Sequence, residues 1–214
     1  MRERNATRQM LLDAGRTMVQ VRGLRGFTVR ELAKRTGVNL GSFVYHFGTR
    51  ERFLAEVVEG WYAPIYVRLR SAAAAPLLKG NTLERLRAMV LEMLELLDTD
   101  AEFVSHLAAD AVAGEWAARD FLLRMPTRDP RLLLRLIAEG QKEGVIRPGA
   151  PMHLMAFVMA GVGFPLILAR GPLKHVDWLQ EVGAPLLEML GDIACARQRL
   201  DWAIQGISLQ RGNL

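Results

Sequence analysis

Hydrophobic residues recur at intervals of three and four positions over long stretches of the chain. This spacing is the period of an amphipathic helix. Alternating runs of β-branched and aromatic residues are nearly absent, as are the Asn-Gly and Asp-Gly pairs typical of tight hairpins. The pattern therefore predicts an all-α chain, with helices near residues 7–22, 29–35, 40–47, 50–74, 83–97, 100–113, 115–124, 130–143, 152–169 and 179–207.

The segment 27–53 contains the clearest helix boundaries in the sequence. Thr28 precedes an apolar-periodic run and is followed three residues later by Glu31, which is the spacing of a capping box. Gly37 is expected to end that helix, because glycine adopts a left-handed backbone at little cost. Asn39 is expected to cap the next helix. The segment thus predicts two short helices joined by a tight turn.

The second of these short helices has two distinct faces. Phe43 and Phe47 lie four positions apart and are expected to anchor it in the core. A helix of this kind can enter the major groove of DNA, with its first residues near the base edges. The alternative is a helical hairpin with no such role. The outward face presents small, hydroxyl-bearing and aromatic side chains, namely Leu40, Gly41, Ser42, Val44, Tyr45 and His46.

The positive charge of the chain is concentrated at its N-terminus. Residues 1–52 contain 11 Lys and Arg against 4 Asp and Glu, a net charge of +7, whereas the remaining residues contain 17 against 19, a net charge of −2. A basic head on a nearly neutral body favours a polyanionic partner, although a solvated face without a partner has the same composition. Arg30 and Arg50 flank the second short helix, where we expect them to contact DNA phosphates.

Residues 7–55 resemble the helix-turn-helix of the TetR (tetracycline-repressor-like) family of transcriptional regulators. The resemblance implies phosphate contacts for Thr28, Arg30 and Arg50. It also implies that residues 39–42 touch bases, while Tyr45 and His46 pack on sugar and phosphate. The matching residues are Thr28-Val29-Arg30-Glu31-Leu32-Ala33, Gly37-Val38, Gly41-Ser42-Phe43, Tyr45-His46-Phe47 and Arg50-Glu51.

Three positions depart from the family pattern. Val44 stands where an aromatic residue is common, and Leu40 where polar or basic residues are frequent. Arg50 replaces the usual lysine. The two apolar residues suit contacts with thymine methyl groups. The resemblance implies a homodimer that binds a double-stranded DNA operator, with residues 1–52 as the DNA-binding domain and residues 53–214 as the helical domain for effector binding and dimerisation.

The body contains aromatic and flexible apolar side chains suited to a small, mostly apolar effector. A plain hydrophobic core is the alternative, and it is the commoner role of such residues. An effector that favours one arrangement of the body would release a repressor from its operator. The candidate effector-binding residues are Trp61, Tyr62, Tyr66, Met89, Met93, Phe103, His106 and Phe121.

The last two predicted helices carry residues suited to a four-helix dimer interface. The resemblance places dimerisation there, and small residues in the first of them let partner helices approach closely. The alternative is the core of a monomer. The candidate interface residues are Ala156, Ala160, Gly163, Leu186, Leu187, Leu190 and Ile193.

Other chemistry is weakly indicated. Glu102, His106 and Asp110 are four positions apart on one helix face and have the side chains of metal ligands, but a solvated face or a helix-end role is the favoured interpretation. Cys195 is expected to be a small core residue. We therefore predict neither a metal nor a cofactor.

Residues 154–169 contain no charge, yet this run is shorter than a membrane span of roughly 20 residues and contains Pro165 and two glycines. We expect a buried interface helix, no membrane partner and a cytoplasmic protein. No phosphate loop, nucleophile elbow or His-Glu-x-x-His helix appears. The alternatives to a regulator are a helical enzyme with a site of scattered residues and a helical scaffold without an effector.

Overall fold

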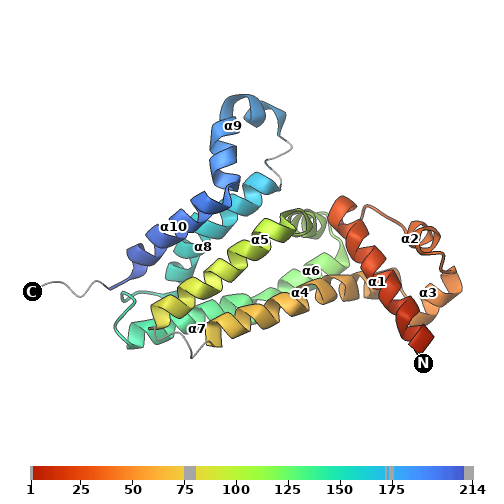
Figure 1. Cartoon of the computed structure of the whole chain (residues 1–214), viewed down its shortest axis with the longest axis horizontal. Helices are drawn as coiled ribbons and strands as arrows, with labels where there is room; N and C mark the ends of the chain where they lie inside the picture. Colours follow the sequence, from red (N-terminus) through yellow and green to blue (C-terminus); the bar gives the residue numbers. More distant parts are fainter. Residues whose placement is uncertain (1, 75–80, 172, 174–175, 210–214) are drawn as a thin grey trace, which may run out of the picture. The chain divides into compact units, whose positions relative to one another are not determined.

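The computed structural model describes residues 2–74, 81–171, 173 and 176–209, except for the side chains of residues 2–4, 126, 179, 180 and 182. The prediction of an all-α chain is confirmed, since the only β pairing in the described residues is an isolated bridge between Ile146 and Ser208. The elements, shown in Figure 1, are α1 (Arg2–Arg22), α2 (Val29–Thr36), α3 (Leu40–Phe47), α4 (Arg50–Ala74), α5 (Thr82–Val112), α6 (Trp116–Arg124), η1 (Met125–Thr127), α7 (Asp129–Lys142), α8 (Pro151–Arg170), α9 (Asp177–Gly191) and α10 (Ile193–Ile207).

Three helices differ clearly from the sequence prediction, and the first is α1, which begins at Arg2 and not near residue 7. The helices expected at 83–97 and 100–113 form the single element α5, which is kinked at Asp100, where the backbone is not helical (φ −118°, ψ 24°). The single helix expected at 179–207 is instead two helices, α9 and α10. The chain breaks at Asp192, whose extended backbone and side chain cap α10 through the amide of Cys195.

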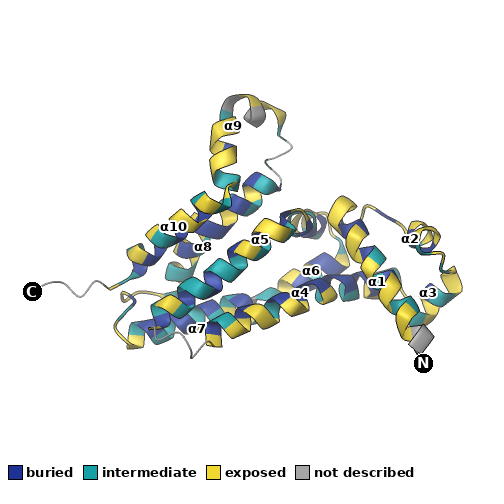
Figure 2. Ribbon diagram, viewed as in Figure 1, coloured by how far each residue is buried: buried dark blue, intermediate teal, exposed yellow. Residues whose placement is uncertain are grey.

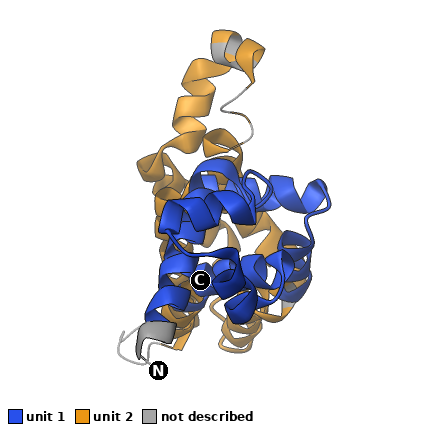
Figure 3. Cartoon of the chain, turned by 90° about the vertical axis from the view of Figure 1, so that its right-hand side faces the viewer, with its two compact units in different colours: residues 1–64, 102–124 blue, residues 65–101, 125–214 orange. Residues whose placement is uncertain are grey.

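The chain divides into two compact units, shown in Figure 3. Unit 1 consists of residues 1–64 and 102–124, and unit 2 of residues 65–101 and 125–214. The boundary within α5 lies next to the kink at Asp100. The division into residues 1–52 and 53–214 concerns function and stays a prediction.

Unit 1 is built around the close approach of α1 to the start of α4. Gly15 of α1 leaves room for Phe53, because an added Cβ at this position would lie 2.5 Å from the Phe53 ring. Phe53 in turn contacts the rings of Phe43 and Phe47, with centroid separations of 5.3 and 4.9 Å. These three phenylalanines are buried, and they join α3 to the rest of the unit.

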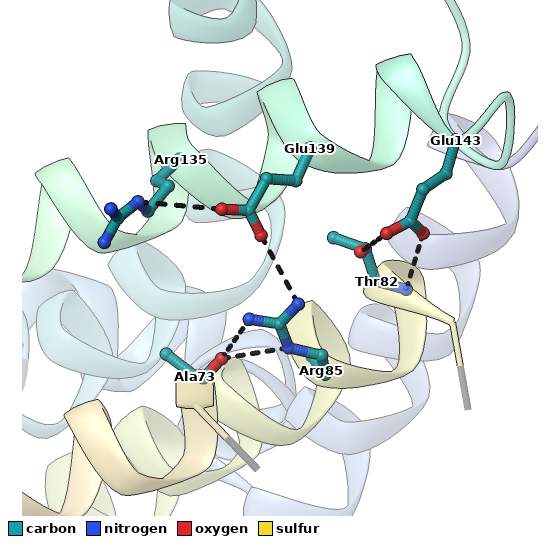
Figure 4. Close-up of polar contacts among 6 residues, drawn as sticks. All are labelled: Ala73, Thr82, Arg85, Arg135, Glu139 and Glu143. Carbon is teal, nitrogen blue, oxygen red and sulfur yellow. Dashed lines mark hydrogen bonds and ion pairs between the residues drawn. The ribbon is translucent and has the colours of Figure 1, made fainter. Parts of the chain in front are cut away.

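Unit 2 contains α7, α8 and α10 packed beside one another. Polar contacts join the end of α4, the start of α5 and α7 (Figure 4). The Arg85 guanidinium donates to the Ala73 carbonyl at 2.7 and 3.0 Å and to Glu139 at 3.3 Å. The Glu143 carboxylate accepts hydrogen bonds from the amide and the hydroxyl of Thr82, and these bonds lower the pKa of Glu143.

Helix α8 is the one described helix that is long and apolar enough to cross a membrane, by length and composition alone. Only 28% of its most apolar 18-residue window is buried. Figure 2 shows exposed positions along this helix. Phe157 and Phe164 are each more than half exposed, so α8 presents an apolar face that the described chain leaves uncovered.

Candidate DNA-binding surface

Short-range hydrogen bonds set the ends of α2. The amide of Glu31 donates to the Thr28 hydroxyl at 3.2 Å, and the amide of Thr28 donates to the Glu31 carboxylate at 2.7 Å. This is the predicted capping box. The bond from the Thr28 amide is the main reason that the pKa of Glu31 is lowered. Gly37 ends the helix with φ +70°, a left-handed conformation that favours glycine.

Helix α3 follows after a tight turn and is capped by Asn39. The Asn39 side-chain oxygen accepts a hydrogen bond from the Ser42 amide at 2.8 Å. Phe43 and Phe47 are each 3% exposed and lie against one another with centroids 5.4 Å apart. The structure therefore confirms the predicted cap and the predicted inner face of this helix.

The outer face of α3 is open to solvent. Tyr45 is 68% exposed, Val44 is 58% exposed and Leu40 is 44% exposed. Gly41 is exposed, whereas Ser42 and His46 are half-buried. The rings of Tyr45 and His46 meet edge to face, with centroids 5.2 Å apart. An exposed apolar and aromatic strip of this kind is typical of an interaction surface.

Thr28 and Arg30, at the start of α2, are exposed. Arg30 forms no ion pair with any described residue. Of the basic residues on α1, Arg8 pairs with Glu56 and lies over the Phe47 ring, 5.4 Å from its centroid. The Arg30 guanidinium is therefore available for a phosphate, whereas that of Arg8 is already engaged within the protein.

Arg50 has contacts that the sequence did not indicate. Its guanidinium donates to the Leu24 carbonyl at 2.5 Å and to the Glu115 carboxylate at 3.1 Å. The Glu115 side chain is 8% exposed and that of Arg50 is 29% exposed, so the pair is largely shielded from water. A phosphate contact by Arg50 stays a prediction, and it would require this pair to open.

A second contact holds the turn between α1 and α2. The amide of Leu24 donates to the Asp110 carboxylate of α5 at 2.6 Å, in a buried position. Gly23 adopts φ +75°, and a Cβ added there would lie 2.7 Å from the same carboxylate oxygen. We call the contacts of Asp110 with Leu24, and of Arg50 with Leu24 and Glu115, the turn clamp.

Asp110 was noticed in the sequence only as part of a possible metal cluster with Glu102 and His106. Its carboxylate instead accepts a backbone hydrogen bond. The described residues contain no group of three or more His, Cys, Asp or Glu side chains placed to hold a metal ion. Cys195 was predicted to be a core residue but is half-buried, and desolvation raises the pKa of its thiol, which favours the unreactive protonated form.

The candidate effector-binding residues divide between the two units. Trp61, Tyr62, Phe103 and Phe121 of unit 1 are at most 3% exposed and pack on one another. Trp61 stacks on Phe103 with centroids 4.3 Å apart, and its indole nitrogen has no hydrogen-bond partner. His106 is half-buried in the same unit. In unit 2, Met89 is fully buried, whereas Tyr66 and Met93 are half-buried.

The candidate dimer residues have mixed exposure. Ala156, Ala160 and Leu186 are exposed, and Leu190 and Ile193 are half-buried. Gly163 and Leu187 face the interior of unit 2 instead. The exposed apolar surface of α8 also includes Phe157 and Phe164, which were not among the candidates. The sequence could have indicated these two residues, because they are aromatic side chains in a predicted helix without charged residues.

The chain is similar to known regulatory proteins. Residues 11–57 match the family model described as bacterial regulatory proteins, tetR family. The HTH-type transcriptional repressor KstR2 of Rhodococcus jostii (strain RHA1) is 26% identical over 151 residues, which cover 71% of this chain and 73% of the relative.

Solved structures show the same fold. The ketosteroid transcriptional regulator KstR2 of Mycobacterium tuberculosis has a TM-score of 0.61 and 22% identity, covering 95% of each chain. The reduced form of NemR from E. coli has a TM-score of 0.67 and 19% identity, covering 97% of this chain and 99% of that one. The capped helix-turn-helix agrees with the family match, so residues 11–57 form the helix-turn-helix described for the tetR family of regulatory proteins, and the whole chain has the fold of TetR-like transcriptional regulators.

Proposed function

We propose that this protein is a cytoplasmic transcriptional repressor that binds its operator as a homodimer and is released by a small-molecule effector. TetR-family regulators bind DNA operators as dimers and respond to small-molecule effectors, and curated relatives of this chain are named transcriptional repressors. The observation that carries the proposal is the exposed outer face of α3, together with an exposed Arg30 on α2 that forms no ion pair with a described residue.

The outer face of α3 suits the major groove of DNA. Leu40, Gly41 and Ser42 form the first turn, from which helix-turn-helix proteins read base edges. Tyr45 and His46 follow one turn later, where they suit packing on sugar and phosphate. Thr28 and Arg30 supply phosphate contacts that fix the position of the head. In a homodimer, two such helices would enter successive major grooves, about 34–36 Å apart.

The apolar face of α8 supports the proposed homodimer. Ala156 and Ala160 allow a second helix to approach, and Phe157 and Phe164 supply area that water would otherwise cover. A self-complementary face of this kind forms a two-fold interface, in which the same patch serves both subunits. We assign α8 to dimerisation for this reason.

The turn clamp supports a route for effector control within unit 1. Asp110 and Glu115, from α5 and the segment before α6, hold the turn that enters α2. A displacement of α5 or α6 therefore moves the start of the helix-turn-helix or breaks these bonds. An effector that binds one arrangement more tightly shifts the equilibrium by that difference in affinity. Phe103 and Phe121 lie on α5 and α6, and Trp61 of α4 stacks on Phe103; these are the effector contacts we propose in unit 1.

The test is fluorescence anisotropy with DNA flanking the coding region and with a scrambled duplex, each at two salt concentrations. We expect selective binding that weakens as salt rises, because bound phosphates release counterions. Arg30→Gln should reduce the salt slope by about 0.9. Arg50→Gln removes the same charge and should also lower the stability of unit 1, because Arg50 binds Glu115 and Leu24 in the fold; a slope reduced by the same amount is expected if the pair opens to bind phosphate. Equal slopes for Arg30→Gln and the unaltered protein would contradict the proposed surface.

A further inference from the structure

A hollow lined by arginines lies in unit 2, where its lining residues come from α4, η1 and α7 and from the residue between the last two. Its volume is about 340 Å³, which falls at the lower end of the roughly 300–1,000 Å³ of small-molecule pockets. The lining residues are Tyr66, Arg70, Thr127, Arg128, Arg131, Leu132 and Arg135.

One of the arginines comes from α4, and the other three come from α7 and the residue before it. Arg131 and Arg135 are four positions apart on α7, and Arg128 precedes that helix as its N-cap. Arg70 of α4 is one turn beyond Tyr66, and its guanidinium lies over the Tyr66 ring, 5.9 Å from the centroid. The hollow therefore brings Arg70 together with three arginines that come much later in the sequence.

Arg70, Arg131 and Arg135 have few acidic partners among the described residues. Arg135 pairs with Glu139 at 3.6 Å, but Glu139 also accepts a bond from Arg85 (Figure 4). Arg70 and Arg131 form no ion pair with the residues that the structure describes. Arg131 and Arg135 are like charges four positions apart on a helix, and such charges repel each other weakly. An anion between the helices would relieve this repulsion.

The start of α7 adds to the positive potential. The first amides of a helix lack partners within the helix and carry a partial positive charge. At α7 the residue in the capping position is Arg128, whose side chain forms no capping hydrogen bond. Asp129, the acid of the first turn, is buried and does not line the hollow. The helix terminus and the arginines thus favour the same kind of ligand.

We propose that this hollow binds a phosphate-bearing small molecule. A carboxylate offers one charge and two oxygens, whereas a phosphate group carries up to two charges and three acceptor oxygens. Guanidinium groups bind phosphate through paired N–H donors, and the hydroxyls of Tyr66 and Thr127 can donate as well. Leu132 and the Tyr66 ring supply the apolar wall for the remainder of the molecule.

The identification of this ligand with the effector rests on the function proposed above, but its binding does not. Tyr66 was predicted from sequence as an effector contact, and it lines this hollow. If this ligand is the effector, the predicted mostly apolar molecule would also carry a phosphate group at one end. Occupation would connect α4 to α7 across the hollow, because the ligand would bridge Arg70 and Arg131.

The experiment is isothermal titration calorimetry of the full chain with three probes: inorganic pyrophosphate, ADP and adenosine. We expect heat from pyrophosphate and ADP and none from adenosine. Tighter binding of ADP than pyrophosphate would identify an organic phosphate, and the reverse a free one. The variant Arg70→Gln/Arg131→Gln should weaken binding at least tenfold. The control Lys142→Gln/Arg147→Gln removes two exposed positive charges from unit 2 outside the hollow and should stay within twofold.

Equal affinity of both double variants, or no heat from either phosphate, would overturn the proposal. Operator binding by the same variants separates this outcome from a failure of the proposed function. Arg70→Gln/Arg131→Gln should retain its affinity for DNA and its salt slope. If that slope falls instead, the hollow contacts the DNA backbone and the small-molecule proposal is wrong. If the protein binds pyrophosphate but no DNA, the proposed site in the hollow is supported and the proposed repressor function is wrong.

Discussion

Helices α3 and α8 both expose apolar side chains, yet their surroundings differ in charge. Tyr45 and Val44 of α3 are 68% and 58% exposed, and Phe157 and Phe164 of α8 are 55% and 53% exposed. Helix α3 belongs to a segment with a net charge of +7, whereas α8 has no charged residue before Arg170.

This difference separates two kinds of partner. DNA presents phosphates as well as base edges, so a surface that binds it needs cations around its apolar contacts. The core of a subunit interface is depleted of charge and enriched in aromatic residues. Exposed apolar residues alone would not distinguish the two surfaces, and the charge beside them does. The comparison predicts that a substitution on α3 weakens DNA binding without affecting the dimer, and that a substitution on α8 weakens the dimer itself.

The largest effect is expected from Phe164→Asp on α8. A carboxylate buried at the centre of an apolar interface without a partner is strongly unfavourable, and interface hot spots cost about 2 kcal/mol or more. We expect the dimer dissociation constant to rise at least roughly hundredfold, as measured by sedimentation equilibrium. Val67→Asp, at a 62% exposed position on α4, should leave the dimer intact. An unchanged dimer in Phe164→Asp would remove α8 from the interface.

The next effect is expected from Asp110→Ala, which tests whether the turn clamp positions α3. The change leaves the buried amide of Leu24 without an acceptor, and such a loss costs about 1–3 kcal/mol. We expect urea unfolding to show this loss and operator affinity to fall with it. Asp110→Asn keeps an acceptor oxygen and should retain most of both. If Asp110→Ala bound the operator normally, the clamp would have no part in DNA binding.

Those parts of the candidate DNA-binding surface that depend on residues close in sequence could be predicted. The ends of α2 and α3 follow from Thr28, Glu31, Gly37 and Asn39, because a cap acts over three or four residues. The turn clamp was not predictable, since Leu24 and Asp110 are 86 positions apart.

The difference between local and long-range contacts also explains why the predicted bounds of some helices were wrong. The break at Asp192 depends on a cap that competes with an otherwise continuous apolar period. The arginines of the hollow could be read from sequence only as separate helix faces. Their approach depends on how α4 and α7 pack, and no local pattern encodes that packing.

A smaller effect, confined to DNA, is expected from Tyr45→Ala. The ring is largely exposed and lies against His46, so its removal creates no cavity in the core. We expect operator affinity to fall about tenfold, which corresponds to about 1.4 kcal/mol, while the dimer and the unfolding midpoint stay unchanged. The readout is fluorescence anisotropy together with sedimentation equilibrium. Normal operator binding would show that the outer face of α3 is not the recognition face.

The smallest effect is expected from Glu31→Gln, which weakens the capping box without removing any exposed apolar residue. Hydrogen bonds from Thr28 lower the pKa of Glu31 in the folded protein. The ionised carboxylate therefore stabilises the fold at pH values above the unfolded pKa, and this contribution is lost as the pH falls through the folded pKa. Urea unfolding of the two proteins should differ at pH 7, and the difference should shrink as the solution becomes acidic. A difference that stays constant down to pH 3 would show that the charge of Glu31 has no part in the cap. The dimer should be unaffected at neutral pH, because the altered residue lies on α2 and the interface proposed here lies on α8.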